Sequence, residues 1–242
     1  MKKLIAILSL ALLPLTGFAS GAVHLESADI DLTDEAAMQR GAKYFVNYCQ
    51  GCHSLKYFRY ENMQKFGLTK DQIRGNLMFG DGKVGDLMTT SMPAVDAAEW
   101  FGTAPPDLTL TARLKHGGAD WIYTYLKSFY VDESRPFGVN NVVFPNVGMP
   151  HVLMELQGVQ EAVKEKDEHG NVHVKELKLV KPGRLSAEEY DELARDLATF
   201  LTHVAEPVKL ERQSIGIWVM LFLLVFFVVS VMLKKEYWKD VH

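Results

Sequence analysis

Cysteine is scarce in this sequence: only Cys49 and Cys52 occur among 242 residues. A structural zinc site needs a second pair of Cys or His ligands beside a Cys-x-x-Cys pair, and the chain has no second cysteine pair. A redox dithiol of the thioredoxin kind belongs to a βαβ setting, whereas the residues before Cys49 have helical spacing. The two cysteines therefore fit neither a structural zinc site nor a thioredoxin-like redox site.

Basic charge and catalytic motifs are limited as well. The formal net charge is −4, and acidic residues outnumber basic ones between the two apolar segments described below. Such a chain is expected to repel nucleic acid, and its acidity either attracts a basic partner or simply favours solubility. The glycine-rich residues 80–83 are not followed by the Ser or Thr of a phosphate-binding loop. No nucleophile–base constellation is visible, so we expect no bond-making catalysis.

The two cysteines belong to the pattern Cys49-Gln50-Gly51-Cys52-His53. Cys-x-x-Cys-His is the signature for covalent attachment of a c-type haem. Each thiol can form a thioether to a haem vinyl group, and His53 then supplies one axial ligand to the iron. Both thiols are used in this way, so no disulfide is expected.

A haem that carries electrons needs a sixth iron ligand, whereas an open position binds gases or peroxide. We favour Met149, which lies between Gly148 and Pro150 in a loop whose stiff backbone can aim a thioether at the iron. Met92, also before a proline, and His151 remain alternatives. A thioether opposite histidine raises the potential relative to two histidines.

The haem propionates carry negative charge and need donors. Arg113 and Lys115 lie just before the glycine pair at 117–118 and are candidates for this role. Both positions are also typical of ordinary surface charge.

Two apolar segments predict export and a membrane anchor. Residues 1–22 have the layout of a secretory signal peptide, with cleavage expected after Ala19 or Ala22. An uncleaved anchor is the alternative, but its apolar run is shorter than the about 20 residues that a span needs. Residues 215–233 contain no charged side chain. At about 1.5 Å per residue they nearly match a hydrocarbon core of roughly 30 Å.

The charges beside this second segment predict its orientation. Lys234 and Lys235 follow it, so the tail 234–242 is expected in the cytoplasm. The body, residues 23–206, then lies in the periplasm and is joined to the anchor by a polar connector, 207–214. We therefore expect a single-pass protein of a bacterial inner membrane, with lipid around its anchor.

Hydrophobic spacing predicts a mainly α fold. We expect a helix capped by Thr33, a helix over 121–129 capped by Asp120, and a helix over 185–204 that starts at a capping box of Ser186 and Glu189. Gly41 within the first helix predicts a close crossing with another helix. Residues 131–150 are expected to be loop, and residues 160–181 a hairpin with its turn at 169–171.

Five motifs together resemble the cytochrome c1 family, the haem subunit of the ubiquinol:cytochrome c oxidoreductase, respiratory complex III. They are Cys-Gln-Gly-Cys-His at 49–53, Ala-Pro-Pro-Asp-Leu-Thr at 104–109, His-Gly-Gly-Ala-Asp-Trp at 116–121, Phe-Pro-Asn-Val-Gly-Met-Pro at 144–150 and Phe-Leu-Thr-His-Val-Ala-Glu-Pro at 200–207. Cys-x-x-Cys-His alone indicates only a c-type cytochrome, whereas the ordered set followed by a C-terminal anchor is specific.

The resemblance implies a cytochrome c-like haem domain with one C-terminal transmembrane helix. It implies thioethers at Cys49 and Cys52, axial ligation by His53 and Met149, and packing near the haem by the prolines at 105–106. In the family a basic residue just before the His-Gly-Gly stretch contacts a haem propionate. This position corresponds to Lys115, while Arg113 remains the alternative. It places the helix that carries Gly41 across the helix that carries residues 197–201.

The implied function is one-electron relay from the Rieske iron–sulfur protein to a soluble or tethered cytochrome c. Cytochrome b is the further implied partner, within a dimeric complex. One rival function is that of a membrane-anchored cytochrome c subunit of a terminal oxidase or nitric oxide reductase, but such subunits commonly have an N-terminal anchor or two haems. A second rival, a haem gas sensor or peroxidase, requires a vacant or labile sixth position.

Overall fold

The computed structural model describes residues 23–166, 170 and 172–240. The predicted signal peptide with both cleavage sites lies outside these residues, as do two of the three residues of the hairpin turn predicted at 169–171. In chain order the elements are α2 (Glu35–Tyr44), the π-helix η1 (Phe45–Cys49), β1 (Leu55–Arg59), the 3₁₀ helix η2 (Tyr60–Phe66), α3 (Lys70–Asn76), β2 (Leu87–Met88), α4 (Ala94–Phe101), α5 (Thr111–Leu114), α6 (Ala119–Lys127), β3 (Phe129–Val131), β4 (Val139–Asn141), α7 (Met154–Gln157), β5 (Gly158–Lys166), β6 (Val172–Pro182), α8 (Ala187–Ala205) and α9 (Lys209–Tyr237).

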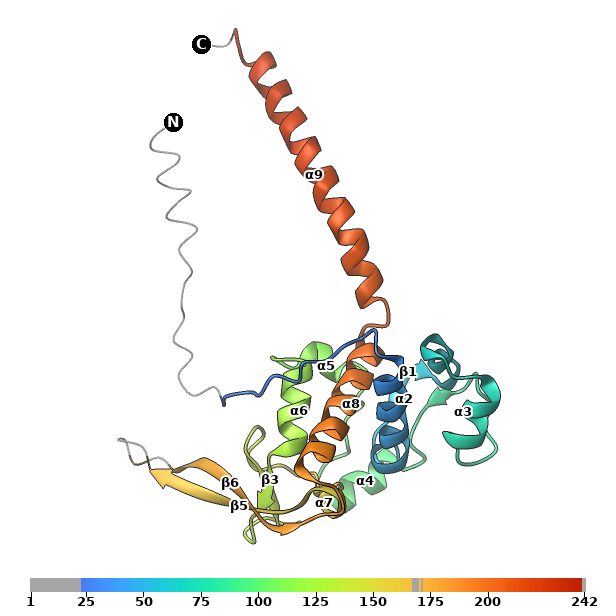
Figure 1. Ribbon diagram of the computed structural model, residues 1–242, viewed down its shortest axis with the longest axis vertical. Helices are drawn as coiled ribbons and strands as arrows, with labels where there is room; N and C mark the ends of the chain where they lie inside the picture. The colour runs from blue at the N-terminus through green and yellow to red at the C-terminus, as the bar shows by residue number, and fades with distance from the viewer. Residues whose placement is uncertain (1–22, 167–169, 171, 241–242) are drawn as a thin grey trace.

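The described chain is a helical body from which one long helix rises (Figure 1). Helices α2, α6 and α8 lie together in the body, and the hairpin β5–β6 lies at the end opposite α9. The three described sheets are antiparallel strand pairs: β1 with β2, β3 with β4, and β5 with β6. The prediction of a mainly α fold is confirmed.

A close crossing of α2 and α8 forms the centre of the core. A Cβ atom on Gly41 of α2 would lie 2.7 Å from Cβ of Phe200 and closer still to the carbonyl oxygen of Asp196. The rings of Phe45 and Phe200 pack 5.8 Å apart beside this crossing. The predicted close approach at Gly41 is therefore confirmed, because only a residue without a side chain lets the two backbones come so near.

Helix ends show which of the predicted caps form. The capping box of Ser186 and Glu189 is present at the start of α8, as predicted. The prediction of Thr33 as a cap is wrong: Asp34 caps α2, its carboxylate accepting from the backbone N–H of Ala37 at 3.0 Å. The hydroxyl of Thr33 instead donates to Asp31, so it is not available to the helix.

The start of α6 also differs from the prediction. Its N-cap is Gly118 rather than Asp120, because the helix begins two residues earlier than predicted, at Ala119. The carboxylate of Asp120 accepts from the backbone N–H of Ala28 at 2.8 Å. Its side chain thus fixes the N-terminal segment onto α6.

The strand pairs agree with the prediction only in part. Residues 131–150 are not all loop, because β3 pairs with β4 and sets Tyr130 opposite Asn140. Met88 lies in β2 opposite Leu55. The hairpin over 160–181 is confirmed and starts two residues earlier, at Gly158.

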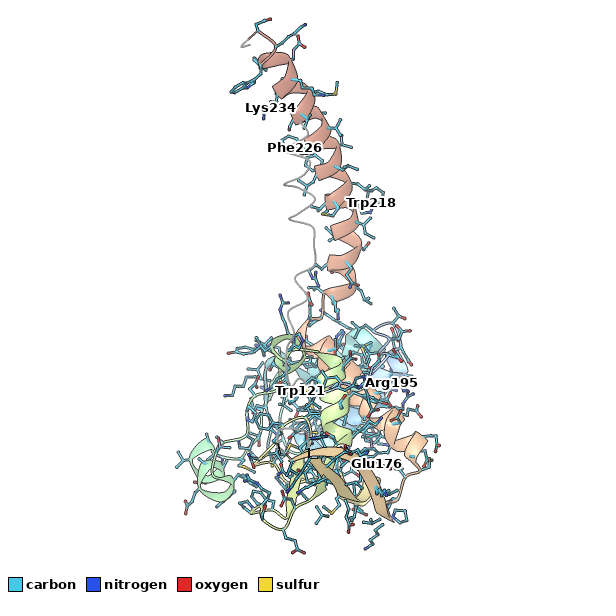
Figure 2. All side chains as sticks on the ribbon, turned by 90° about the vertical axis from the view of Figure 1, so that its left-hand side faces the viewer. Trp121, Glu176, Arg195, Trp218, Phe226 and Lys234 are labelled. Carbon is cyan, nitrogen blue, oxygen red and sulfur yellow. The ribbon has the colours of Figure 1, made fainter. Side chains whose placement is uncertain are left out.

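Helix α9 begins at Lys209, so most of the predicted connector 207–214 is helical. It is the one helix among the described residues that is long and apolar enough to cross a membrane. Its side chains, among them Trp218 and Phe226, point outward on all sides (Figure 2) and are exposed in the isolated chain. A helix that is apolar all round needs a non-aqueous surrounding, which a bilayer supplies.

The crossing at Gly41 generates a stability prediction. Gly41→Ala should lower the free energy of unfolding by about 1–3 kcal/mol, because the overpacking exceeds the helix propensity that alanine adds. Urea unfolding of the detergent-solubilised protein, followed by circular dichroism, measures the change.

Gly75→Ala in α3 is the matched control. A Cβ atom there meets nothing within 4 Å in the described chain, so this substitution should be neutral or stabilise by up to about 1 kcal/mol. Equal effects of the two substitutions would contradict the crossing.

Candidate functional site

One cavity of about 580 Å³ brings the predicted haem residues together. This volume lies within the roughly 300–1,000 Å³ of sites for cofactors and small molecules. Its lining includes Cys49, Cys52, His53, Pro105, Pro106, Lys115 and Met149, and its walls are mainly apolar side chains such as Leu197 and Leu201 from α8. Residues far apart in the sequence thus converge on one space.

The attachment motif lies at the end of the helical run that begins with α2. Helix η1 ends at Cys49, whose carbonyl oxygen accepts from the backbone N–H groups of Cys52 and His53 at 3.0 and 2.8 Å. This tight turn holds the motif together at one wall of the cavity. π-helical turns of this kind are frequent at functional sites.

The two cysteines form no disulfide, and each residue is partly exposed as a whole. Desolvation by burial and the neighbouring Cys52 raise the pKa of the Cys49 thiol to about 12. A redox dithiol depends instead on a thiol whose pKa is lowered, so that the thiolate forms near neutral pH. The environment of Cys49 therefore argues against the dithiol interpretation of the motif.

His53 is buried and held in one orientation. Its Nδ1 lies 2.7 Å from the carbonyl oxygen of Pro106, and since a carbonyl only accepts, Nδ1 carries the proton. The Nε2 lone pair is then free to bind a metal. Burial lowers the pKa of His53, which favours the neutral imidazole that a metal requires. Pro106 thus acts through its backbone oxygen.

Met149 lines the same cavity, and the hydroxyl of Tyr125 lies 3.3 Å from its Sδ. The alternatives are placed differently. His151 lies outside the lining, where its ring stacks on Phe129 with 4.7 Å between centroids, and burial lowers its pKa to about 4. Met92 also lies outside the lining and follows a turn fixed by Thr90.

Two buried asparagines hold the loop that carries Met149. The side-chain oxygen of Asn141 accepts from the backbone N–H groups of Val143 and Phe144 at 2.9 and 3.1 Å. The side-chain oxygen of Asn140 accepts from the N–H of Asn146 at 2.8 Å. Because these bonds fix the loop on both sides of Phe144, they limit where Met149 can lie.

The structure also distinguishes Lys115 from Arg113, the two basic residues considered as partners of a haem propionate. Lys115 lines the cavity, and its ammonium group lies 4.6 Å from the ring centroid of Trp121 and 5.2 Å from that of Phe144. Arg113 lies outside the lining and forms an ion pair with Glu206 at 3.5 Å. The cavity edge therefore holds the ammonium group of Lys115 rather than the guanidinium of Arg113.

The residues of the large cavity fit a c-type haem. Two thiols, an imidazole with a free Nε2 and a thioether share one lining, while apolar walls suit the porphyrin and a cation lies at the edge. Sequence reasoning missed Tyr125 and the two asparagines as contributors. The spacing of α6 indicated only that Tyr125 faces inward, and an Asn-Asn pair in a presumed loop carried no signal of burial.

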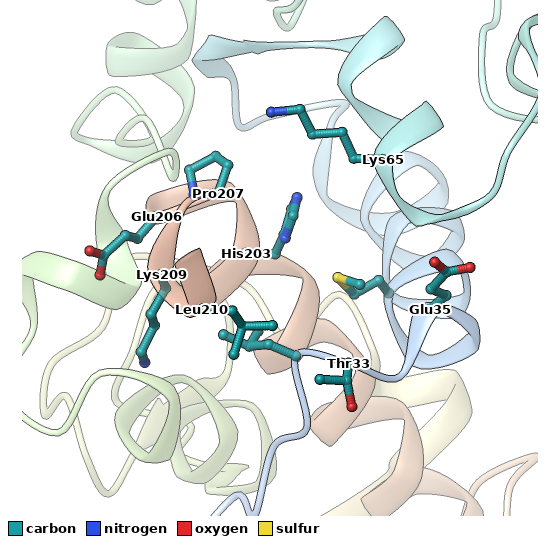
Figure 3. A pocket seen from close by; sticks show the side chains of 10 residues that line it. Thr33, Glu35, Lys65, His203, Glu206, Pro207, Lys209 and Leu210 are labelled. Atoms are coloured by element: carbon teal, nitrogen blue, oxygen red, sulfur yellow. The ribbon is translucent and has the colours of Figure 1, made fainter. Parts of the chain in front are cut away.

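A second cavity, of about 360 Å³, lies where α8 meets α9 (Figure 3). Its lining includes His203, Lys65, Glu35 and Lys209 and contains neither cysteine. In the close-up, the side chains of Glu206 and Lys209 point away from His203. The polar groups thus do not converge on a common point, and this cavity is not the haem site.

The family is decided by a sequence comparison: the model of the Cytochrome C1 family matches residues 27–176 and 182–241. The chain belongs to the cytochrome c1 family. A cytochrome c1 of Allochromatium vinosum is 56% identical, and the alignment covers all of both chains. The mitochondrial cytochrome c1 of Saccharomyces cerevisiae is 28% identical, with 86% of this chain and 68% of the yeast protein covered.

Another relative carries a different name. The ammonia monooxygenase gamma subunit of Nitrosomonas europaea is 42% identical, covering 98% of this chain and 97% of that protein. The match to the cytochrome c1 family spans nearly the whole described chain, and relatives named cytochrome c1 occur in bacteria and in mitochondria.

Membership confirms several predictions. Cytochrome c1 is a haem c protein, so the chain has one covalently bound haem and the cytochrome c1 fold. It is the electron-transfer subunit of the bc1 complex, and the two rival functions are not favoured. With α9 as its anchor, the chain is a single-pass membrane protein.

His203, in the second cavity, generates a pH prediction for cytochrome c1. Its Nε2 is buried and has no hydrogen-bond partner within the described part of the chain. Burial, and to a smaller extent Lys65, lowers the pKa of His203. The unfolded chain then binds a proton that the folded chain does not, so stability should fall as pH drops below the ordinary histidine value of about 6.5.

His203→Gln should therefore flatten the stability profile below about pH 6.5. Urea midpoints measured across this range test the effect, with His173→Gln, at an exposed position on β6, as the control. A profile as steep as that of the wild type would show that His203 is not responsible.

Proposed function

We propose that Cys49 and Cys52 would hold the haem through thioethers, and that His53 and Met149 would be its iron ligands. The observation that carries this assignment is the single cavity on which all four side chains converge. When bound, the haem supplies a one-electron couple between ferrous and ferric iron. The protein positions this couple and sets its potential.

The chain's own residues divide this work. Pro106 keeps the proton of His53 on Nδ1 through its carbonyl oxygen, which leaves Nε2 as the ligand atom. Asn140 and Asn141 hold the Met149 loop, and the apolar walls exclude water from the iron. Lys115, which lines the cavity, would supply the positive charge for a propionate. Pro105 and Pro106 line the cavity and would pack beside the porphyrin.

Within the bc1 complex, the chain would take an electron from the Rieske iron–sulfur protein and pass it to a soluble or tethered cytochrome c. It would bind cytochrome b alongside α9, in a dimeric complex. The body, 23–206, would lie in the periplasm of a bacterium after removal of the signal 1–22. The helix would cross the inner membrane at 215–233, and the tail 234–242 would lie in the cytoplasm, as the lysines after the span suggest.

Met149→Ala tests the axial ligand. Loss of the thioether should lower the midpoint potential by a sizeable part of the roughly 0.8 V over which axial ligands move haem potentials. The thioether-to-iron charge-transfer absorption of the ferric protein should disappear. Met149→His should restore six-coordination while keeping the potential low, which guards against a merely misfolded alanine variant. Redox titration and visible spectroscopy measure both effects.

Met92→Ala is the matched control and should leave potential and spectrum as in the wild type. A Met149→Ala protein with an unchanged potential and charge-transfer absorption would contradict the assignment and return attention to Met92 or His151.

Lys115→Ala tests the propionate contact. Removing a positive charge near the haem favours the oxidised form, so the potential should fall, whereas Arg113→Ala should change it less because Arg113 pairs with Glu206. Redox titration at low ionic strength shows the difference most clearly. A larger effect of Arg113→Ala would reverse the assignment.

A further inference from the structure

The hydroxyl of Tyr125 meets the sulfur of Met149 at 3.3 Å, on the border of the haem cavity. Both residues line this cavity, although Tyr125 comes from α6 and Met149 from the loop after β4. A thioether sulfur has no proton and accepts only weakly, so the phenol donates in this contact. Met149 is the hydrogen-bond partner of this hydroxyl within the described chain.

Neighbouring groups hold the Tyr125 ring in place. Its ring stacks on Trp121, one turn earlier on α6 and labelled in Figure 2, with 4.9 Å between centroids and 11° between planes. The ring of Phe129 packs edge-on against the Tyr125 ring, with 5.2 Å between centroids. The position of the hydroxyl is therefore set by packing and does not depend on Met149 alone.

The same buried asparagine ties Tyr125 to the Met149 loop. The side-chain nitrogen of Asn141 donates to the backbone oxygen of Tyr125 at 2.8 Å, while its side-chain oxygen holds the N–H groups of Val143 and Phe144. Asn141 is fully buried. Donor and acceptor are thus fixed relative to each other through one side chain.

A comparison with Tyr190 indicates that this contact is more than core packing. Tyr190 is also buried, but its hydroxyl donates to the backbone oxygen of Leu126 at 2.9 Å, as expected of a structural tyrosine. The hydroxyl of Tyr125 instead points at a sulfur on the lining of the haem site.

We propose that Tyr125 is a positioning residue that tunes the haem potential by donating a hydrogen bond to Sδ of Met149. This inference rests on the proposed ligation by Met149. A thioether sulfur has two lone pairs, so one could bind iron while the other accepts the hydrogen bond from the phenol. The hydrogen bond draws electron density from the sulfur, which weakens its donation to ferric iron and raises the potential. It also selects one orientation of the Met149 side chain.

Tyr125→Phe tests the proposal because it removes the hydroxyl and keeps the ring stack. The equilibrium constant for reduction should fall about two- to fivefold, the order of one net hydrogen bond. The thioether-to-iron absorption should persist but shift. Tyr123→Phe is the matched control: it lies two residues away on α6, and its hydroxyl donates to Asp191 at 2.6 Å, away from the cavity.

The outcomes separate this proposal from the ligand assignment. A fall in potential with Tyr125→Phe but not with Tyr123→Phe supports the hydrogen bond. An unchanged potential and absorption in Tyr125→Phe, or equal shifts in both variants, overturns it. If the absorption survives Met149→Ala, the ligand assignment itself is wrong. If the absorption vanishes in Met149→Ala while Tyr125→Phe has the potential and absorption of the wild type, Met149 remains the ligand and only the role of Tyr125 is contradicted.

Discussion

The haem cavity depends on how closely α2 and α8 cross. Gly41 lets the backbones meet, and the paired rings of Phe45 and Phe200 fill the space beside the contact. The crossing is reinforced by Arg40 of α2, which binds both carboxylate oxygens of Asp196 at 2.6 and 2.9 Å. Because η1 continues α2 directly into Cys49, the crossing angle also sets where the attachment motif faces α8.

The pKa values of both partners in this ion pair are raised, which favours the neutral form of Asp196 but the charged form of Arg40. Burial raises the pKa of Asp196 despite its partner, while the hydrogen bond to Asp196 raises the pKa of Arg40. The geometry is decisive here: a bidentate guanidinium–carboxylate contact with a buried acid is an arrangement in which both charges persist. Removing Arg40 would leave the buried carboxylate of Asp196 without this partner, so the pair is better understood as specifying the packing than as a large source of stability.

Much of the site could be predicted from the sequence, since its chemistry is local. Cys49, Cys52 and His53 are adjacent, and Gly41 indicated the crossing because a glycine inside a helix otherwise costs stability. Contacts between distant segments could not be predicted in this way. Asp120 looked like a helix cap but binds Ala28, and Asn141 looked like a loop residue but is buried between Tyr125 and the Met149 loop. Local propensity does not show which distant backbone group a short polar side chain will reach.

The central claim is that protein side chains occupy both axial positions of the iron, with His53 as one ligand and Met149 as the other. The most direct measurement is the visible spectrum of the reduced, undenatured wild-type protein with carbon monoxide. Our account predicts no rapid change, because a strong sixth ligand leaves no vacancy. Rapid formation of the carbon monoxide adduct would contradict it, since only an open or labile sixth position binds the gas in that way.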